Sequence, residues 1–139
     1  MKLSLITTDK DVPLNVDLYK GNLNDITILN VQLDKLDTSN FDKNKVIFMA
    51  DKGYDSSILR NKLSNYFYKI IIPYNKRNTK VINKIKILSN DDKILYKKRI
   101  TIENTFLKIK KHRRLEIVYE KHFKNFISFI YLSLIKLVI

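Results

Sequence analysis

The fold of this 139-residue chain is constrained most by two short apolar runs, "KVIFMA" at 45–50 and "YKIIIPY" at 68–74. Each run has the length of a strand and is apolar without alternation, which is the pattern of a strand buried on both faces. The stretch "SILRNKLSNY" between them predicts a helix, and either Asp55 or Ser56 can serve as its N-cap. Pro73 ends the second run. The sequence therefore predicts a strand, a helix and a second strand in this order.

The residues before the first run predict a hairpin followed by a helix. "LSLITT" at 3–8 and "VPLNVDLY" at 12–19 favour strands, and a polar triplet between them favours a turn. Pro13 limits how centrally the second strand can lie in a sheet. Asn24 or Asp25 can then cap a helix over "ITILNVQLDKL".

The second half of the chain is predicted to be mainly helical. Residues 75–95 are polar and ambiguous, so they form either a linker or a weak helix, and helices are expected over about 96–112 and about 121–138. The resulting order of strands and helices is typical of a mixed α/β chain. The apolar end "FISFIYLSLIKLVI" has 14 residues including Lys136, which is short for a membrane span of about 20 residues. We expect a buried core helix there.

The composition excludes several classes of protein. The chain has no cysteine, so it has no disulfide and no thiolate metal site. The first residues, "MKLSLITTDKDV", carry too short an apolar stretch for a secretory signal peptide. A cytoplasmic protein that is neither secreted nor membrane-spanning is expected.

The positive charge lies entirely in the second half of the chain. Residues 1–68 carry nine basic and nine acidic side chains, whereas residues 69–139 carry 18 basic and five acidic ones, which accounts for the whole net charge of +13. A basic half beside a neutral half favours a polyanionic partner, most often nucleic acid. The alternative is solubility in a lysine-biased proteome.

Asp51 is the first candidate for a metal-binding residue along the chain. It follows the apolar run at 45–50 and precedes Gly53, so it is expected at the carboxyl end of an interior strand, where open α/β sheets place ligand-binding groups. A carboxylate there suits Mg²⁺, which takes one or two protein carboxylates together with waters and phosphate oxygens. The alternative is that Asp51 only begins a turn.

A second carboxylate, Glu103, lies in the most basic run of the chain. On an uninterrupted helix at 100° per residue, four polar residues share an arc of about 60°: Tyr96, Arg99, Glu103 and Lys110. Arg99 and Lys110 favour the ionised form of Glu103, so this strip can present a metal-binding oxygen beside two phosphate-binding cations. The alternative is a structural Arg99–Glu103 pair at i, i+4, worth a few tenths of a kcal/mol.

These residues resemble a known family. "ADKGYDSSILRNKL", "IIIPYNKRN" and the spacing Tyr96-x₂-Arg99-x₃-Glu103-x₆-Lys110 are similar to the DDE transposases of bacterial insertion sequences, in the group with a Y-R-E-K signature. The likeness runs from about residue 2 to 135 and includes the hairpin and helix that precede the second catalytic Asp in those enzymes. It implies an RNase H-like mixed sheet flanked by helices, with three carboxylates that hold two Mg²⁺ ions for phosphoryl transfer.

The resemblance also implies roles for single residues. Asp51 matches the second catalytic Asp and Glu103 the catalytic Glu, so both are expected to bind Mg²⁺. Tyr96, Arg99 and Lys110 match the signature residues that grip transposon-end DNA. From charge alone, we predict four further contacts to the DNA backbone, and these are Lys108, Lys111, Arg113 and Arg114.

The sequence departs from the family pattern at the first catalytic Asp. That residue belongs on a central strand upstream of the hairpin, and the sequence begins at Met1 inside the hairpin. Asp9 and Asp11 fall in the predicted turn, and Asp17 lies on a strand that does not bear metal in the family. We therefore expect the first, central strand and the N-terminal domain that binds transposon ends to be missing.

Residues 1–139 are accordingly predicted to be a partial transposase catalytic domain, and this chain alone is expected not to cleave DNA. Its expected partners are transposon-end DNA and either an upstream-encoded transposase half or a second copy. One alternative is a non-enzymatic basic DNA-binding protein derived from a transposase. A further alternative is a membrane-surface protein that uses its basic half and apolar C-terminus.

Overall fold

The computed structural model describes residues 2–10, 12–39, 41–42, 44–75, 87–110 and 123–139. The chain divides into two compact units. The central unit comprises Leu23–Arg99, and the terminal unit combines Met1–Asn22 with Ile100–Ile139.

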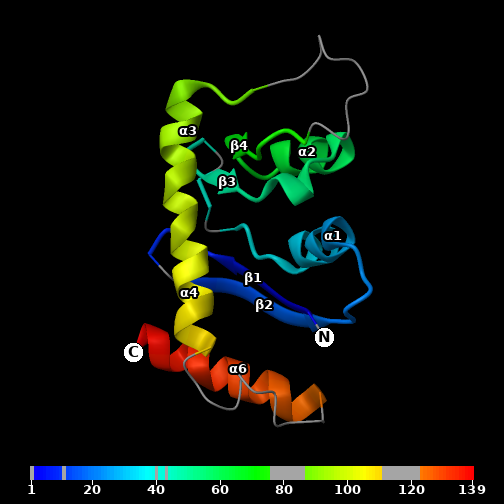
Figure 1. The fold of residues 1–139 in the computed structure, drawn as a ribbon, viewed down its shortest axis with the longest axis vertical. Helices are drawn as coiled ribbons and strands as arrows, with labels where there is room; N and C mark the ends of the chain where they lie inside the picture. The colour runs from blue at the N-terminus through cyan, green and yellow to red at the C-terminus, as the bar shows by residue number, and fades with distance from the viewer. Residues whose placement is uncertain (1, 11, 40, 43, 76–86, 111–122) are drawn as a thin grey trace. The chain divides into compact units, whose positions relative to one another are not determined.

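The central unit contains the strand, helix and strand predicted from the two apolar runs. β3 (Ile47–Met49) pairs in parallel with β4 (Lys69–Ile71), and α2 (Ser57–Ser64) connects them. Figure 1 shows the two strands side by side next to α2. Backbone hydrogen bonds extend the pairing beyond both ends of β3, because Ala50 N–H donates to Ile71 at 3.3 Å and Tyr68 N–H donates to Val46 at 3.0 Å.

The burial of β3 differs from the prediction. Phe48 is buried, but Ile47 and Met49 are only half-buried, so burial on both faces is wrong for this strand. The described part of the chain gives β3 a single strand neighbour, β4, and a strand at a sheet edge is covered less completely than an interior one. At the end of β4, in contrast, Ile71 and Ile72 are fully buried.

Two helices of the central unit, α1 and α2, were predicted correctly. α1 (Asp25–Lys35) is capped by Asn24, whose side chain accepts the N–H of Ile26 at 2.9 Å. α2 is capped by Ser56, which accepts the N–H of Leu59. The buried apolar side chains of this unit come from the two helices and from the strands and the residues beside them: Ile28, Leu29, Leu33, Phe48, Leu59, Leu63, Phe67, Ile71 and Ile72.

The helix predicted over 96–112 has a different form. Helical structure already begins with α3 (Asn90–Tyr96), which is capped by Ser89, and passes through a 3₁₀ turn η4 (Lys97–Arg99) into α4 (Ile100–Lys110). The single α-helix from residue 96 is therefore wrong. Of the ambiguous stretch 75–95, the last residues are helical, and residues 76–86 lie outside the described part.

The terminal unit contains the predicted hairpin. β1 (Lys2–Thr7) pairs antiparallel with β2 (Pro13–Tyr19). Thr8 holds the turn, because its N–H donates to the carbonyl of Val12 at 2.9 Å and its hydroxyl accepts the N–H of Val12 at 3.2 Å. Local hydrogen bonds from a threonine hydroxyl are typical of turns.

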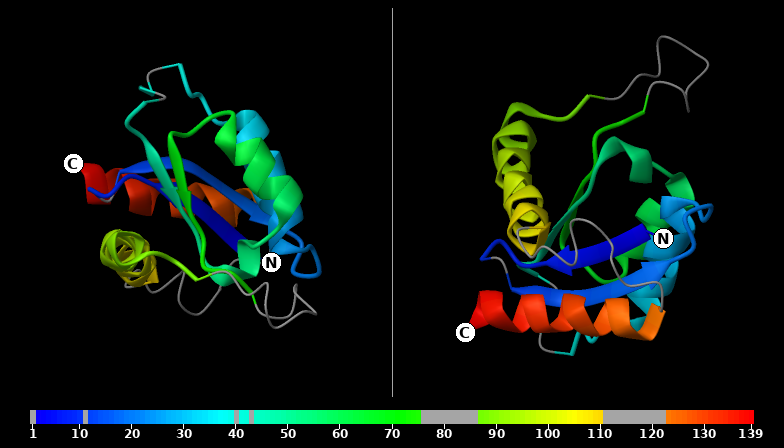
Figure 2. Two further views of the ribbon diagram at one scale, coloured as in Figure 1. Left: turned by 90° about the horizontal axis from the view of Figure 1, so that it is seen from above. Right: turned by 60° about the horizontal axis from the view of Figure 1, so that its bottom comes forward.

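α6 (Phe123–Val138) lies along the hairpin in the same unit (Figure 2). Its side chains Phe126, Ile130 and Leu134 recur every four residues and pack with Leu18 and Ile109 in one buried cluster. The opposite side of α6 is exposed, with Leu132 61% accessible. The predicted core helix is therefore buried on one face only, the face that meets β2 and α4. No described helix is long and apolar enough to cross a membrane.

The predicted mixed α/β class is confirmed. Within the described residues the strands form two separate two-stranded sheets, β1 with β2 and β3 with β4.

Candidate functional site

Asp51 lies at the end of β3, as the sequence predicts. The residue before it, Ala50, is still bonded to the neighbouring strand, and Asp51 itself is extended, with φ −69° and ψ 159°. It is the N-cap of the 3₁₀ turn η1 (Lys52–Tyr54), and its carbonyl accepts the N–H of Tyr54 at 2.9 Å. Its side chain does not cap the turn and is exposed to solvent. The carboxylate is therefore accessible while its backbone is held in place.

Tyr54, close to Asp51, has a phenol whose pKa is shifted by its surroundings. Burial raises the pKa of its phenol, the nearby carboxylates of Asp25 and Asp51 raise it further, and Arg99 acts in the opposite direction. Asp25 begins α1, against which η1 packs. The phenol thus remains a protonated hydrogen-bond donor at neutral pH and lies within electrostatic reach of three charged groups.

Two of the residues predicted to bind DNA, Tyr96 and Arg99, lie together in the central unit. The guanidinium carbon of Arg99 is 5.5 Å from the centroid of the Tyr96 ring, within the range of a cation–π contact. The two residues are three apart in continuous helical structure, a separation that makes side chains neighbours. Both side chains are half-buried.

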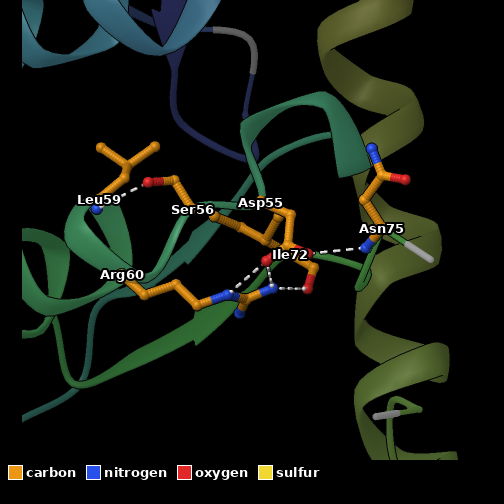
Figure 3. Close-up of polar contacts among 6 residues, drawn as sticks. All are labelled: Asp55, Ser56, Leu59, Arg60, Ile72 and Asn75. Atoms are coloured by element: carbon orange, nitrogen blue, oxygen red, sulfur yellow. Dashed lines mark hydrogen bonds and ion pairs between the residues drawn. The ribbon is translucent and has the colours of Figure 1, made fainter. Parts of the chain in front are cut away.

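Asp55 and Arg60 form a polar network directly after η1 (Figure 3). Asp55 Oδ1 lies 2.9 Å from both Nε and Nη2 of Arg60, and its Oδ2 accepts the backbone N–H of Asn75 at 2.7 Å. Arg60 Nη2 also donates to the carbonyl oxygen of Ile72 at 2.7 Å, and its guanidinium carbon lies 4.1 Å from the centroid of the Tyr74 ring. The network joins the turn after β3, the helix α2 and the chain that leaves β4.

Glu103 lies in the first turn of α4 and is exposed. It belongs to the terminal unit, whereas Asp51 belongs to the central one, and their convergence on one cation stays a prediction. The common arc of Glu103 with Tyr96 and Arg99 assumed one uninterrupted α-helix, which the turn at 97–99 interrupts.

The remaining predicted DNA contacts divide into two groups. Lys108 is exposed on α4. Lys110 is the last residue of that helix, and its side chain is outside the described part, as are Lys111, Arg113 and Arg114 entirely. Contact of these bases with DNA stays a prediction.

The described residues contain no group of three or more His, Cys, Asp or Glu side chains that could hold a metal. Asp51 by itself fits the preference of Mg²⁺ for one carboxylate on a fixed backbone, with waters and phosphate oxygens in the other positions. The chain can therefore offer one such ligand in the central unit.

The sequence did not predict the roles of Tyr54, Asp25 and the Asp55–Arg60 pair. Asp55 was one of two candidate caps for α2, but Ser56 takes that place, and Asp55 binds Arg60 instead. The five-residue separation of Asp55 and Arg60 is not a helical contact spacing. When one of two adjacent cap candidates serves as the N-cap, the other can bind elsewhere, but the sequence gives only a weak indication of where. The contact of Asp55 with Asn75, twenty residues later, is seen only in the folded chain.

Comparison with known proteins identifies one family. A family model described as "Transposase DDE domain" matches residues 1–137. Neither the curated proteins nor the solved structures contain a significant match.

Proposed function

The chain belongs to the transposase DDE domain family, and on this premise we propose that it is part of an RNase H-like catalytic domain of the Y-R-E-K group. The function that fits this membership is Mg²⁺-dependent cleavage and strand transfer of transposon-end DNA. It would take place on genomic DNA in the cytoplasm.

In this proposal Asp51 and Glu103 are the metal ligands. When bound, Mg²⁺ would activate the attacking water or DNA 3′-hydroxyl and stabilise the leaving oxygen. The observation that carries the assignment is the position of Asp51, an exposed carboxylate at a strand end. The preceding residue, Ala50, is bonded to β4, and the carbonyl of Asp51 accepts the N–H of Tyr54 in η1. Such preorganisation holds a ligand in place without occupying its oxygens.

The proposed DNA contacts are the basic and aromatic residues that follow. Tyr96, Arg99 and Lys110 would hold transposon-end DNA, and the contact between Tyr96 and Arg99 supports a joint role for these two. A guanidinium presents planar donors that match phosphate oxygens. Further backbone contacts would come from four bases, namely Lys108, Lys111, Arg113 and Arg114.

The two carboxylates are two-thirds of the family's metal site, so we propose that these 139 residues alone do not cleave DNA. In the described residues β1 pairs only with β2 and β3 only with β4, which supports a sheet that lacks its central strand. An Asp-bearing strand would have to come from sequence that precedes residue 1, from a separately encoded transposase half or from a second copy.

Reconstitution of cleavage tests the proposal. The chain is co-expressed with the polypeptide encoded directly upstream, and nicking of transposon-end DNA is measured with Mg²⁺. Cleavage is expected only with both parts, and Asp51→Asn or Glu103→Gln should abolish it, while Asp34→Asn at an exposed ion pair should not. Cleavage that survives Asp51→Asn would contradict the assignment.

A second candidate function is non-enzymatic DNA binding, which would describe the chain if no Asp-bearing partner exists. The excess charge of residues 69–139 favours it. It predicts binding to duplex DNA that weakens steeply with salt and that does not change with Mg²⁺ or with Asp51→Asn. Binding that is insensitive to ionic strength would exclude it.

A further inference from the structure

The backbone of Asp51 is fixed from both sides by β4 and the residues that follow it. On one side, Ala50 N–H donates to the carbonyl of Ile71. On the other side, Asp55 binds the backbone N–H of Asn75 through its carboxylate, and its partner Arg60 binds the carbonyl of the buried Ile72. The chain from Ala50 to Asp55 is therefore anchored at both of its ends to the same segment, which is β4 and the residues that follow it.

Between the two anchors the chain has little freedom. Tyr54 N–H donates to Asp51 at 2.9 Å and Asp55 N–H donates to Lys52 at 3.1 Å, which closes the 3₁₀ turn η1. A displacement of Asp55 would therefore be passed through this one turn to Asp51. Gly53 lies in the middle of the turn, and a side chain there would meet no atom within 4 Å, so packing around Gly53 does not supply the restraint.

The Asp55–Arg60 pair has the properties of a fixed anchor. Its side chains are only 11% and 19% exposed, and both oxygens of Asp55 accept donors from defined directions. Buried ion pairs contribute little net stability, because desolvation offsets their attraction, but loss of one partner leaves an uncompensated charge. The planar guanidinium adds a fixed geometry that lysine cannot reproduce.

We propose that Asp55 and Arg60 are positioning residues for Asp51, which hold the turn η1 against the end of β4 and so fix the place of the Asp51 carboxylate. The part of this inference that concerns metal binding rests on the proposed function. The part that concerns the position of the turn does not.

Amide hydrogen exchange in the whole chain tests the position of the turn. In Asp55→Asn, exchange of the Ala50 and Tyr54 amides should become faster by about tenfold, because local opening costs less. The amide of Ile28 in α1 is bonded to the carbonyl of the N-cap Asn24, away from the turn η1, and its exchange should change much less. Equal acceleration at Ile28, or no acceleration at Ala50 and Tyr54, would overturn the proposal.

Arg60→Lys separates the geometry from the charge. This variant keeps a cation near Asp55 but loses the planar guanidinium, whose Nε and Nη2 both contact Asp55. Exchange of the Ala50 and Tyr54 amides should therefore still be accelerated. The matched control is Asp34→Asn, which removes the exposed Lys62–Asp34 pair of 2.8 Å in the same unit and should leave both amides unchanged. If the Ala50 and Tyr54 amides of Arg60→Lys exchange as slowly as in the wild type, the role of the guanidinium geometry is overturned.

Mn²⁺ affinity, measured by electron paramagnetic resonance, tests the link to the ligand. Asp55→Asn should weaken Mn²⁺ binding several-fold in the wild-type chain but not in the Asp51→Asn background, which is the coupling expected of a positioning residue. Equal weakening in both backgrounds would overturn that link. Mn²⁺ binding that does not depend on Asp51 would refute the proposed metal role, whereas the exchange data would still judge the position of the turn.

Discussion

The backbone N–H of Tyr54 donates a 2.9 Å hydrogen bond to the carbonyl of Asp51, so a phenol and a carboxylate project from the same 3₁₀ turn. Burial and the carboxylates of Asp25 and Asp51 raise the pKa of the phenol, and Arg99 only partly opposes them. This electrostatic relation can be measured without any activity.

Tyr54 should ionise above the ordinary tyrosine pKa of about 10, and Asp51→Asn should lower its pKa, because one of the negative charges that oppose ionisation is removed. Carbon-13 NMR of the tyrosine ring carbons during a pH titration checks this, with Tyr54→Phe to assign the signal. A Tyr54 pKa that is the same in the wild type and in Asp51→Asn would contradict the expected proximity of the two groups.

The same shift predicts the pH dependence of stability. The folded state holds the Tyr54 proton more tightly than the unfolded state, so this contribution is fully present below about pH 10 and is lost as the pH rises through the raised folded pKa. Urea unfolding of the wild type and of Tyr54→Phe should therefore diverge above pH 10. Parallel pH profiles would show that Tyr54 contributes nothing to this loss.

Leu59 should be a main contributor to the stability of the central unit. It is fully buried on α2, and Leu59→Ala should lower the free energy of unfolding by about 2–5 kcal/mol, through lost burial and the cavity left behind. The neighbouring Ile58 is 78% exposed, so Ile58→Ala is the matched control and should stay within about 0.5 kcal/mol. Urea denaturation measures both, and equal effects would contradict this placement of α2.

The sequence predicted well where local chemistry decides the structure. The threonine-stabilised hairpin turn and the caps Asn24 and Ser56 depend on hydrogen bonds between residues close in the chain. The position of Asp51 followed from an apolar run ending at a charged residue.

The features that were missed depend on residues distant in the sequence or on small changes in helix form. Asp55 finds its partners in Arg60 and, twenty residues later, in Asn75, and no local pattern identifies such a network. The 3₁₀ turn at 97–99 was not predicted, because the helical wheel assumed 100° per residue throughout. On α6 the apolar composition alone could not show which face would be covered.

Arg99 should contribute to DNA binding as a phosphate contact. Arg99→Ala is expected to weaken binding to duplex DNA across sequences and to reduce the slope of log affinity against log salt by about one. Lys45 is an exposed base in the neutral half of the chain, so Lys45→Ala is the control and should leave the slope unchanged. Fluorescence anisotropy over a salt series measures both. Equal slopes for Arg99→Ala and wild type would contradict a phosphate contact.

The convergence of Asp51 and Glu103 makes the sharpest prediction. If both carboxylates bind one cation, removal of either ligand disrupts the same site, so Asp51→Asn and Glu103→Gln should each weaken Mn²⁺ binding and the double variant should be little worse than either alone. Such non-additivity is the signature of groups that act together, whereas two independent sites would give effects that add. The measurement is Mn²⁺ titration of the four proteins by electron paramagnetic resonance, carried out on the chain together with the Asp-bearing partner. Asp34→Asn, which removes an exposed carboxylate on α1, should leave the affinity unchanged. Additive losses, or a Glu103→Gln variant with wild-type affinity, would separate the two acids and contradict the assignment of Glu103 to this metal site.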